Sequence, residues 1–294
     1  RFPERYQRAL YVCDWTFGTM YAIHLEPEGS TYRGAKEEFV ARTPLPLTDV
    51  TIGRDGAMYF TVGGRGGQSE LYRVRYAGTE PVVPVDGADS REMAARATRR
   101  SLETLHRRMD DPAAAVATAL PQLASSDRFL RYAARVALEH QPLETWKEAA
   151  LNHPDPSARI EGAIAVARQA EPEAQPEVLA ALGSVDGAGL SPEDRLRLVR
   201  ACQLALIRLG EPPADVRAAI AAHVMPLFPT GSDDLDRELA SLLAAVRAPG
   251  IVPRLVGLLA DRGGSTPPTT STADEAEVRT LIERNAGYGE AVRA

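Results

Sequence analysis

The chain has 294 residues, enough for two domains or for one domain with an elongated repeat array. Its formal net charge is −6, with 25% charged and 44% hydrophobic residues, a composition typical of globular proteins. The acidic balance argues against binding to nucleic acid, which needs a concentrated basic surface. No apolar run approaches the roughly 18 residues of a membrane-spanning helix.

The two cysteines and the two chain termini further limit the classes of protein to which the chain could belong. Cys13 and Cys202 are the two cysteines, and neither belongs to a C-x-x-C or C-x-x-C-H pattern, which excludes covalent c-type haem and cysteine-rich zinc sites within this chain. A disulfide between them would join the two halves described below, and we do not expect one. The chain starts at RFPERY without Met or a signal sequence and stops in YGEAVRA, so we expect it to be a piece of a longer protein.

The first part of the chain predicts β-structure. Seven of the nine tyrosines lie before residue 77, in short β-branched and aromatic runs separated by Asp-Gly, Pro-Glu-Gly and glycine-rich breaks. Regular short strands with tight turns are typical of a sandwich, a barrel or a propeller. Six strands equal about one and a half propeller blades and fall short of a closed ring. The expected strands cover residues 9–15, 19–25, 36–41, 47–53, 57–62 and 70–76.

A glycine-rich loop, residues 63–67 (GGRGG), separates the last two predicted strands. A dinucleotide-binding fingerprint requires a strand that leads into a helix, whereas this loop leads from strand to strand. The structural interpretation is a hairpin that needs positive φ at several positions, with Arg65 pointing to solvent. The functional interpretation places Arg65 at the mouth of a propeller, where its planar guanidinium would hold a carboxylate of a quinone cofactor or of a substrate.

Two aspartates are further candidates for the same mouth. Asp14 ends a predicted strand next to Trp15, so both side chains would lie near the strand ends. The structural alternative is that Asp14 accepts hydrogen bonds from turn amides while Trp15 fills the gap between blades. Asp49, at the start of a strand, has the same two interpretations. The five histidines are scattered without metal-binding spacing, and no nucleophile elbow is present.

Residues 79–90 form a predicted linker, after which alanine dominates and helices are expected. The best-defined helix covers residues 191–210. Ser191 is suited to the N-cap, Pro192 to the first helical position, and Gly210 to the end. Its apolar positions form one stripe: Leu196, Val199, Cys202, Leu206 and Leu209.

Similar helical patterns recur at residues 126–140, 155–169, 213–228 and 234–260 with irregular spacing. Paired short helices with alanine-rich faces predict a HEAT- or armadillo-like α-solenoid over residues 91–261. An irregular helical bundle is the alternative. A flexible linker at 262–273 and a terminal helix at 274–294 complete the predicted organisation.

Residues 1–78, from RFPERYQRALYVCDW to QSELYRVRYAG, carry a family likeness. This stretch resembles the closing blades of the glucose/sorbosone-dehydrogenase-like β-propeller in the large PVC-type haem-binding, membrane-bound-dehydrogenase-like proteins. The helical half is similar to the HEAT-type segment that follows the propeller there, and RNAGYGEAVRA is similar to the end of that segment. The likeness is strong over residues 1–78 and loose afterwards.

The resemblance implies an exported protein of the periplasm or cell envelope that oxidises sugars or related alcohols and passes electrons to a c-type cytochrome domain. Its implied partners are the remaining propeller blades and the cytochrome domain of the same polypeptide. This chain departs from the family because it has no C-x-x-C-H and only part of a propeller. Haem binding and complete dehydrogenase activity are therefore not carried over, and no cofactor is expected within the chain, with a quinone as the open alternative.

Two functional hypotheses follow. In the enzymatic one, the chain is part of that dehydrogenase-like protein, with Arg65 as the main ligand-binding residue and Asp14 and Asp49 as polar partners. In the non-catalytic one, a propeller fragment and a solenoid dock domains or proteins, with the curved helical face as the binding surface. The sequence contains no evident acid–base pair or metal cluster, so the second hypothesis is at least as well supported for this chain alone.

Overall fold

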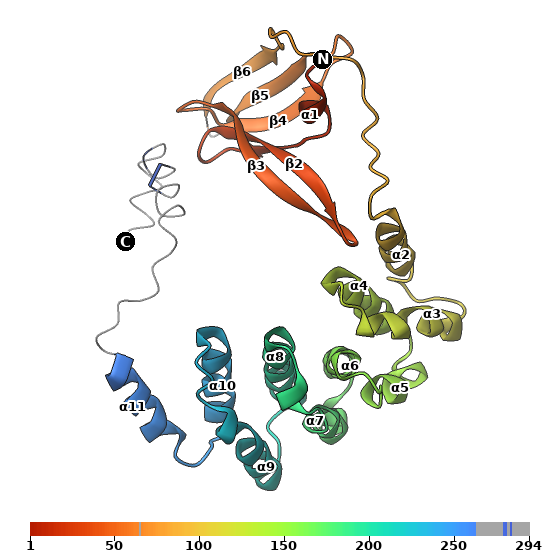
Figure 1. Ribbon diagram of the computed structural model, residues 1–294, viewed down its shortest axis with the longest axis vertical. Helices are drawn as coiled ribbons and strands as arrows, with labels where there is room; N and C mark the ends of the chain where they lie inside the picture. Colours follow the sequence, from red (N-terminus) through yellow and green to blue (C-terminus); the bar gives the residue numbers. More distant parts are fainter. Residues whose placement is uncertain (65, 263–278, 281–282, 284–294) are drawn as a thin grey trace. The chain divides into compact units, whose positions relative to one another are not determined.

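The computed structural model describes residues 1–64, 66–262, 279–280 and 283. The chain divides into two compact units, one containing Arg1–Met93 and the other Ala94–Ser265. Within the described residues, every strand belongs to the first unit, and the second is built from helices (Figure 1). The predicted order of a β part followed by an α part is confirmed. The predicted linker 262–273 and terminal helix 274–294 lie almost wholly outside the described residues.

The first unit contains two three-stranded antiparallel sheets, preceded by one helical turn, α1 (Glu4–Gln7). The strands of the first sheet, in the order β1-β2-β3, are β1 (Leu10–Asp14), β2 (Thr19–Glu28) and β3 (Thr31–Ala41). The strands of the second, in the order β4-β5-β6, are β4 (Leu47–Ile52), β5 (Met58–Gly64) and β6 (Gly67–Val74). All six expected strands are present, and they divide three and three.

The β2–β3 hairpin is longer than the sequence predicted. β3 begins at Thr31 rather than at residue 36, because Gly29 (φ +55°) and Ser30 close a tight turn. Pro27, which was expected to break the strand, lies inside β2 opposite Tyr32. Its missing N–H is tolerated because β1 pairs with β2 only as far as Ile23, so β2 has one free edge at this point.

Alternating side chains of both sheets meet in one apolar core. In β5, Met58, Phe60 and Val62 are buried at every second position, as the period of a half-buried strand requires. Met20 of β2 and Leu47 of β4 belong to the same cluster. The sheets of this unit are therefore held together by a shared core.

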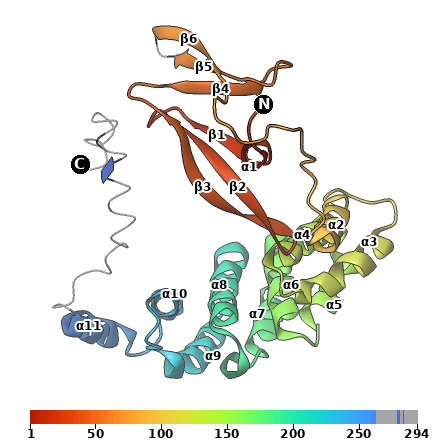
Figure 2. The ribbon, with the colours of Figure 1, turned by 45° about the horizontal axis from the view of Figure 1, so that its top comes forward.

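The second unit consists of short helices joined by tight connections (Figures 1 and 2). Its first five helices are α2 (Met93–Glu103), α3 (Pro112–Ala119), α4 (Arg128–Glu139), α5 (Lys147–Leu151) and α6 (Pro156–Gln169). The next five are α7 (Gln175–Gly183), α8 (Pro192–Leu209), α9 (Ala214–Val224), α10 (Asp233–Ala245) and α11 (Ile251–Arg262).

Capping residues set several of these boundaries. The side chains of Asp127, Asp155 and Ser191 each accept a hydrogen bond from a backbone N–H in the first turn of α4, α6 and α8. Gly210 (φ +95°) ends α8. The helices predicted at 126–140, 155–169 and 191–210 are confirmed, the last with its predicted N-cap Ser191.

The helices of the second unit lie in two layers. Neighbouring helices pack in the pairs α3/α4, α5/α6, α7/α8 and α9/α10. The second members of these pairs also pack on one another in the sequence α4, α6, α8, α10. In Figure 1 the pairs of this unit follow a curve, with these four helices on its inner side. We call this row the inner layer, and the row α3, α5, α7, α9 the outer layer.

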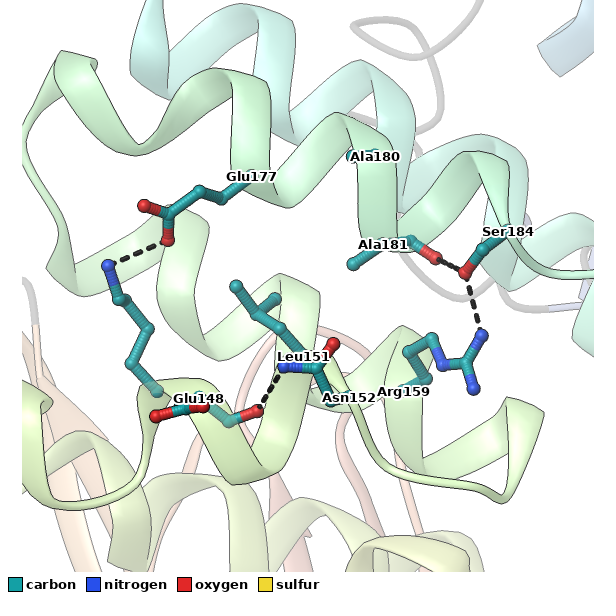
Figure 3. Close-up of a pocket in the computed structure, with 9 residues that line it drawn as sticks. Glu148, Leu151, Asn152, Arg159, Glu177, Ala180, Ala181 and Ser184 are labelled. Carbon is teal, nitrogen blue, oxygen red and sulfur yellow. Dashed lines mark hydrogen bonds and ion pairs between the residues drawn. The ribbon is translucent and has the colours of Figure 1, made fainter.

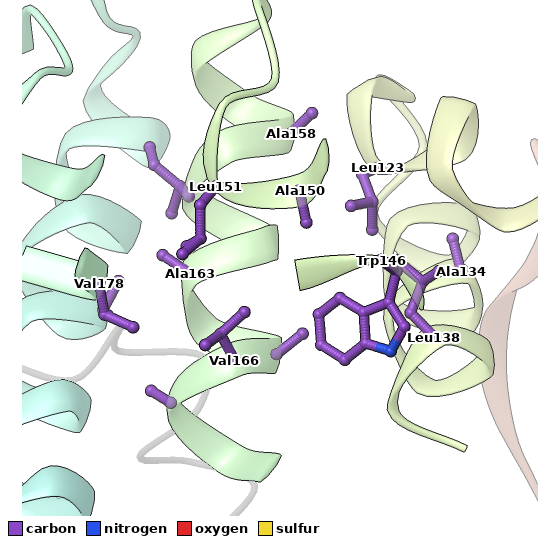
Figure 4. Packing of buried hydrophobic residues seen from close by; sticks show 14 of the residues in the cluster. Leu123, Ala134, Leu138, Trp146, Ala150, Leu151, Ala158, Ala163, Val166 and Val178 are labelled. Atoms are coloured by element: carbon purple, nitrogen blue, oxygen red, sulfur yellow. The ribbon is translucent and has the colours of Figure 1, made fainter. Parts of the chain in front are cut away.

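Small residues let the helices approach closely around a large aromatic side chain. Trp146 lies at the centre of the main core cluster beside Leu123 and Leu138 (Figure 4). A Cβ atom at Gly162 of α6 would lie 2.7 Å from the carbonyl oxygen of Ala150 in α5, so this helix contact requires glycine.

Candidate functional site

The glycine loop forms the predicted hairpin between β5 and β6. Gly64 pairs with Gly67, and Gly63, Gly64 and Gly66 have φ angles of +152°, +108° and +78°. Such angles favour glycine over residues that carry a Cβ atom. The hairpin and its positive φ angles are therefore confirmed. Arg65, whose orientation was also predicted, lies outside the described residues.

The turn after β1 contacts this hairpin. The indole Nε1 of Trp15 donates a hydrogen bond to the carbonyl oxygen of Gly63 at 3.0 Å. Asp14 Oδ1 accepts hydrogen bonds from the backbone N–H groups of Thr16 (2.9 Å) and Phe17 (3.0 Å). The carboxylate of Asp14 thus has the structural role that the sequence offered as an alternative, and Trp15 joins the two sheets.

Asp49, the third predicted site residue, is exposed in β4, and its Oδ1 accepts a hydrogen bond from the backbone N–H of Val50 at 2.8 Å. Burial, and secondly the charge of Asp49, raise the pKa of the Cys13 thiol in β1. The structure thus places Asp49 near β1, while the turn of Asp14 contacts the glycine hairpin through Trp15.

Glu37 of β3 is the centre of a polar cluster that the sequence did not reveal. Its carboxylate accepts hydrogen bonds from Arg5 at 2.7 Å and from the hydroxyl of Tyr6 at 2.8 Å, and it lies 2.6 Å from Nε2 of His24. The hydrogen bonds with His24 and Tyr6, and then the charge of Arg5, lower the pKa of Glu37. These residues come from α1, β2 and β3, so no linear motif connects them.

Asp55, in the turn between β4 and β5, supports a pH prediction. Its carboxylate accepts hydrogen bonds from Arg73 (2.6 Å), the backbone N–H of Ala57 (3.1 Å) and the hydroxyl of Tyr59 (2.9 Å). These contacts, the one with Arg73 foremost, lower its pKa from 3.8 to about 2. Because the folded pKa is depressed, this stabilisation is present above about pH 4 and is lost as the pH falls towards about 2.

We therefore expect Asp55→Asn to flatten the acid limb of the stability–pH curve of the first unit between about pH 4 and about pH 2. Urea unfolding followed by the fluorescence of Trp15 measures this in a Trp146→Phe background, which removes the second tryptophan. Thr51→Ala, an exposed change in β4 that removes no titrating group, is the control and should leave the slope unchanged. An unaltered slope in Asp55→Asn would contradict the prediction.

The second unit has a groove of about 590 Å³ between α5, α6 and α7 (Figure 3). Two contacts cross it: Lys147 Nζ lies 2.7 Å from Glu177 Oε2, and a guanidinium nitrogen of Arg159 donates to Ser184 Oγ at 2.7 Å. Leu151 lies between these two contacts in Figure 3. The groove therefore combines an apolar wall with charged groups at both ends.

Arg159 and Glu148 remain without an opposite charge in this groove. Arg159 Nε donates to the carbonyl oxygen of His153 at 3.0 Å, and in the described part of the chain no carboxylate pairs with its guanidinium. No cation pairs with Glu148 among those residues. The two charges had no distinguishing signal in the sequence.

Ion pairs connect the helices of the inner layer. Glu161 of α6 lies 3.5 Å from a nitrogen of Arg135 in α4 and 3.5 Å from one of Arg197 in α8. Further pairs between these helices are Arg168–Glu139 at 2.9 Å, Arg131–Glu193 at 3.3 Å and Arg200–Glu238 at 3.2 Å. On two of these helices, Tyr132 of α4 is 57% exposed and Ile207 of α8 is 78% exposed.

The described residues were compared with the requirements of metal sites, membrane-spanning helices and disulfides. No group of three or more His, Cys, Asp or Glu side chains is placed there to hold a metal ion. None of the helices described is both long and apolar enough to span a bilayer. Cys13 and Cys202 are both free thiols.

Comparison of the chain with known protein families, with curated proteins and with solved structures finds no match.

Proposed function

We propose that this chain is a non-catalytic binding module, in which a HEAT-like α-solenoid presents its inner layer to a protein partner. The observation that carries the proposal is the continuous row α4, α6, α8, α10, in which each helix packs on the next. Extended repeat arrays bind partners along such rows. Ion pairs between the helices hold the row in one arrangement, so a partner meets a surface that is already ordered.

Tyr132 and Ile207 are the proposed anchors on this layer. Both are large, exposed side chains on helices of the inner layer, and tyrosine is a frequent hot-spot residue at protein interfaces. The guanidinium of Arg135 lies 5.3 Å from the centre of the Tyr132 ring and limits its motion.

The sheets are proposed to be the closing strands of a β-propeller. A propeller blade has four strands, whereas each sheet here has three, so each would be completed by a strand elsewhere in the polypeptide. The remaining blades of the same polypeptide are therefore the proposed partners of the first unit.

The test compares variants of the two layers. The chain is used to capture a partner from an extract of its source, and the partner is then purified and its dissociation constant measured. We expect Tyr132→Glu and Ile207→Glu each to weaken binding at least tenfold, because a charge would replace an apolar anchor. Glu148→Lys, an exposed charge change on the outer layer, is the matched control and should leave the affinity within twofold.

Retention of full affinity by both inner-layer variants would overturn the proposal, as would a loss confined to Glu148→Lys. Circular dichroism of each variant establishes that its helix content is unchanged.

We propose a second candidate function, an enzymatic one. It is favoured by the hydrogen bond from Trp15 to Gly63, which brings the turn of Asp14 to the glycine hairpin. In this proposal the chain belongs to an exported dehydrogenase-like protein that oxidises a sugar or related alcohol, and the haem lies in another part of the polypeptide. Arg65→Ala in the full-length protein should then abolish substrate-dependent reduction of an electron acceptor without unfolding the protein. Unchanged turnover with lowered thermal stability would assign Arg65 to structure.

A further inference from the structure

An apolar cavity of about 410 Å³ lies between α7, α8, α9 and α10. Its walls are aliphatic, with side chains that include Leu179, Leu198, Val216, Ile220 and Leu239. The Cys202 thiol also lines it, and burial raises the pKa of this thiol to about 12, so that wall is uncharged. The volume falls in the range of small-molecule pockets, roughly 300–1,000 Å³.

The cavity lies at the boundary between two hydrophobic clusters of the helical unit. The helical unit has two separate clusters of buried side chains, and Cys202, Leu206 and Ile220 lie at the border of both. Two small residues, Gly183 and Ala219, line the cavity where larger ones would fill it. Both residues are exposed, and a Cβ atom at Gly183 would meet nothing within 4 Å, so the cavity opens to solvent beside them.

The cavity has an extension and one polar residue of its own. A second cavity of about 340 Å³ shares the walls Leu198, Leu227 and Leu239 with it and is also lined by Arg195 and Thr230, so the two form one elongated and mostly apolar space. His223 lines the first cavity and is exposed at its rim. Its imidazole has no hydrogen-bond partner among the residues that the structure describes.

We propose that this cavity binds an amphiphile with a linear acyl chain and a carboxylate head, the chain lying between α7, α8 and α9 and the head at His223. An elongated space with mostly aliphatic walls suits a flexible hydrocarbon chain, because burial of the chain removes both its own surface and the cavity walls from water. Among the residues that line the first cavity, His223 supplies an imidazole N–H at the rim that can donate a hydrogen bond to the carboxylate head. Neither the protein-binding layer nor the glycine hairpin is part of this site.

The probe is dodecanoate, titrated below its micelle concentration and followed by calorimetry with the whole chain. We expect saturable binding to one site. Ala219 is an exposed residue that lines the cavity, so Ala219→Trp fills the cavity from its opening and should weaken binding at least tenfold. Ala222→Trp is the matched control, because Ala222 is exposed on the same helix and does not line the cavity, and it should bind like the wild type.

A second pair of probes tests the head group. His223→Ala should weaken dodecanoate at least threefold and dodecanol by less, because a hydrogen bond to the charged carboxylate is about twice as strong as one to a neutral hydroxyl. If Ala219→Trp does not fold, Gly183→Leu replaces it as the cavity-filling variant. Absence of saturable dodecanoate binding, or equal affinities for the cavity-filling variant and the wild type, would overturn the site. Equal losses for both probes in His223→Ala would overturn the assignment of the head group.

Discussion

Trp146→Ala should lower the free energy of unfolding of the helical unit by about 3–5 kcal/mol, the usual cost of removing a large buried aromatic side chain. Trp146 is 1% exposed and is among the largest fully buried side chains of the described residues. Its neighbours include alanines such as Ala134 and Ala150, which have no longer side chain that could move into the vacated space (Figure 4). The cavity would therefore stay largely open, which places the cost high in this range.

Urea unfolding followed by circular dichroism at the helical band measures this loss. Tyr132→Ala is the control, because it also removes an aromatic ring but from a position that is 57% exposed, and it should change the free energy by less than about 1 kcal/mol. In Trp146→Ala the remaining tryptophan, Trp15, reports on the first unit, whose unfolding should be unaltered. Similar losses in both variants would contradict the assignment of Trp146 to the core.

Local patterns predicted the elements well because they act over a few residues. The N-caps Asp127, Asp155 and Ser191 satisfy backbone N–H groups within their own first turn, so their effect is visible in the sequence. The strand boundaries were less accurate at the β2–β3 hairpin, because whether Pro27 is tolerated depends on where β1 ends. That is a property of strand pairing and not of the residues beside the proline.

The polar clusters around Glu37 and Gln141 could not be predicted, because their partners come from distant parts of the chain. Glu37 meets Arg5 and His24 only after α1 folds against the β2–β3 hairpin. Gln141 is buried, and its amide donates to the carbonyl oxygen of Arg107 at 2.9 Å, while its Oε1 accepts from the backbone N–H of Met109 at 3.2 Å. These partners lie more than 30 residues away along the chain. Of the three predicted site residues, Asp14 is engaged in its own turn, Asp49 remains an exposed candidate, and Arg65 lies outside the described residues.

Glu161→Gln should lower the free energy of unfolding of the helical unit by about 1–3 kcal/mol. It removes the carboxylate that two enclosed arginines share, although Arg135 keeps Glu139 and Arg197 keeps Asp194 as a partner. The side chains of Glu161, Arg135 and Arg197 are only 12%, 16% and 15% exposed. Glutamine has nearly the same shape as glutamate, so the change removes the charge without opening a cavity. We place the loss below that of a fully buried pair, because each side chain retains some contact with water.

The matched control is Asp234→Asn, which removes the charge that pairs with Arg237 at 3.3 Å on α10. These two side chains are 77% and 72% exposed, so water and salt screen the pair and the expected loss is at most about 1 kcal/mol. The contrast also bears on the proposed binding surface, since Glu161 connects α4, α6 and α8 whereas Asp234 pairs within one helix. If Glu161→Gln costs no more than Asp234→Asn, the ion pairs do not order the inner layer, and its order must come from the apolar contacts beneath it.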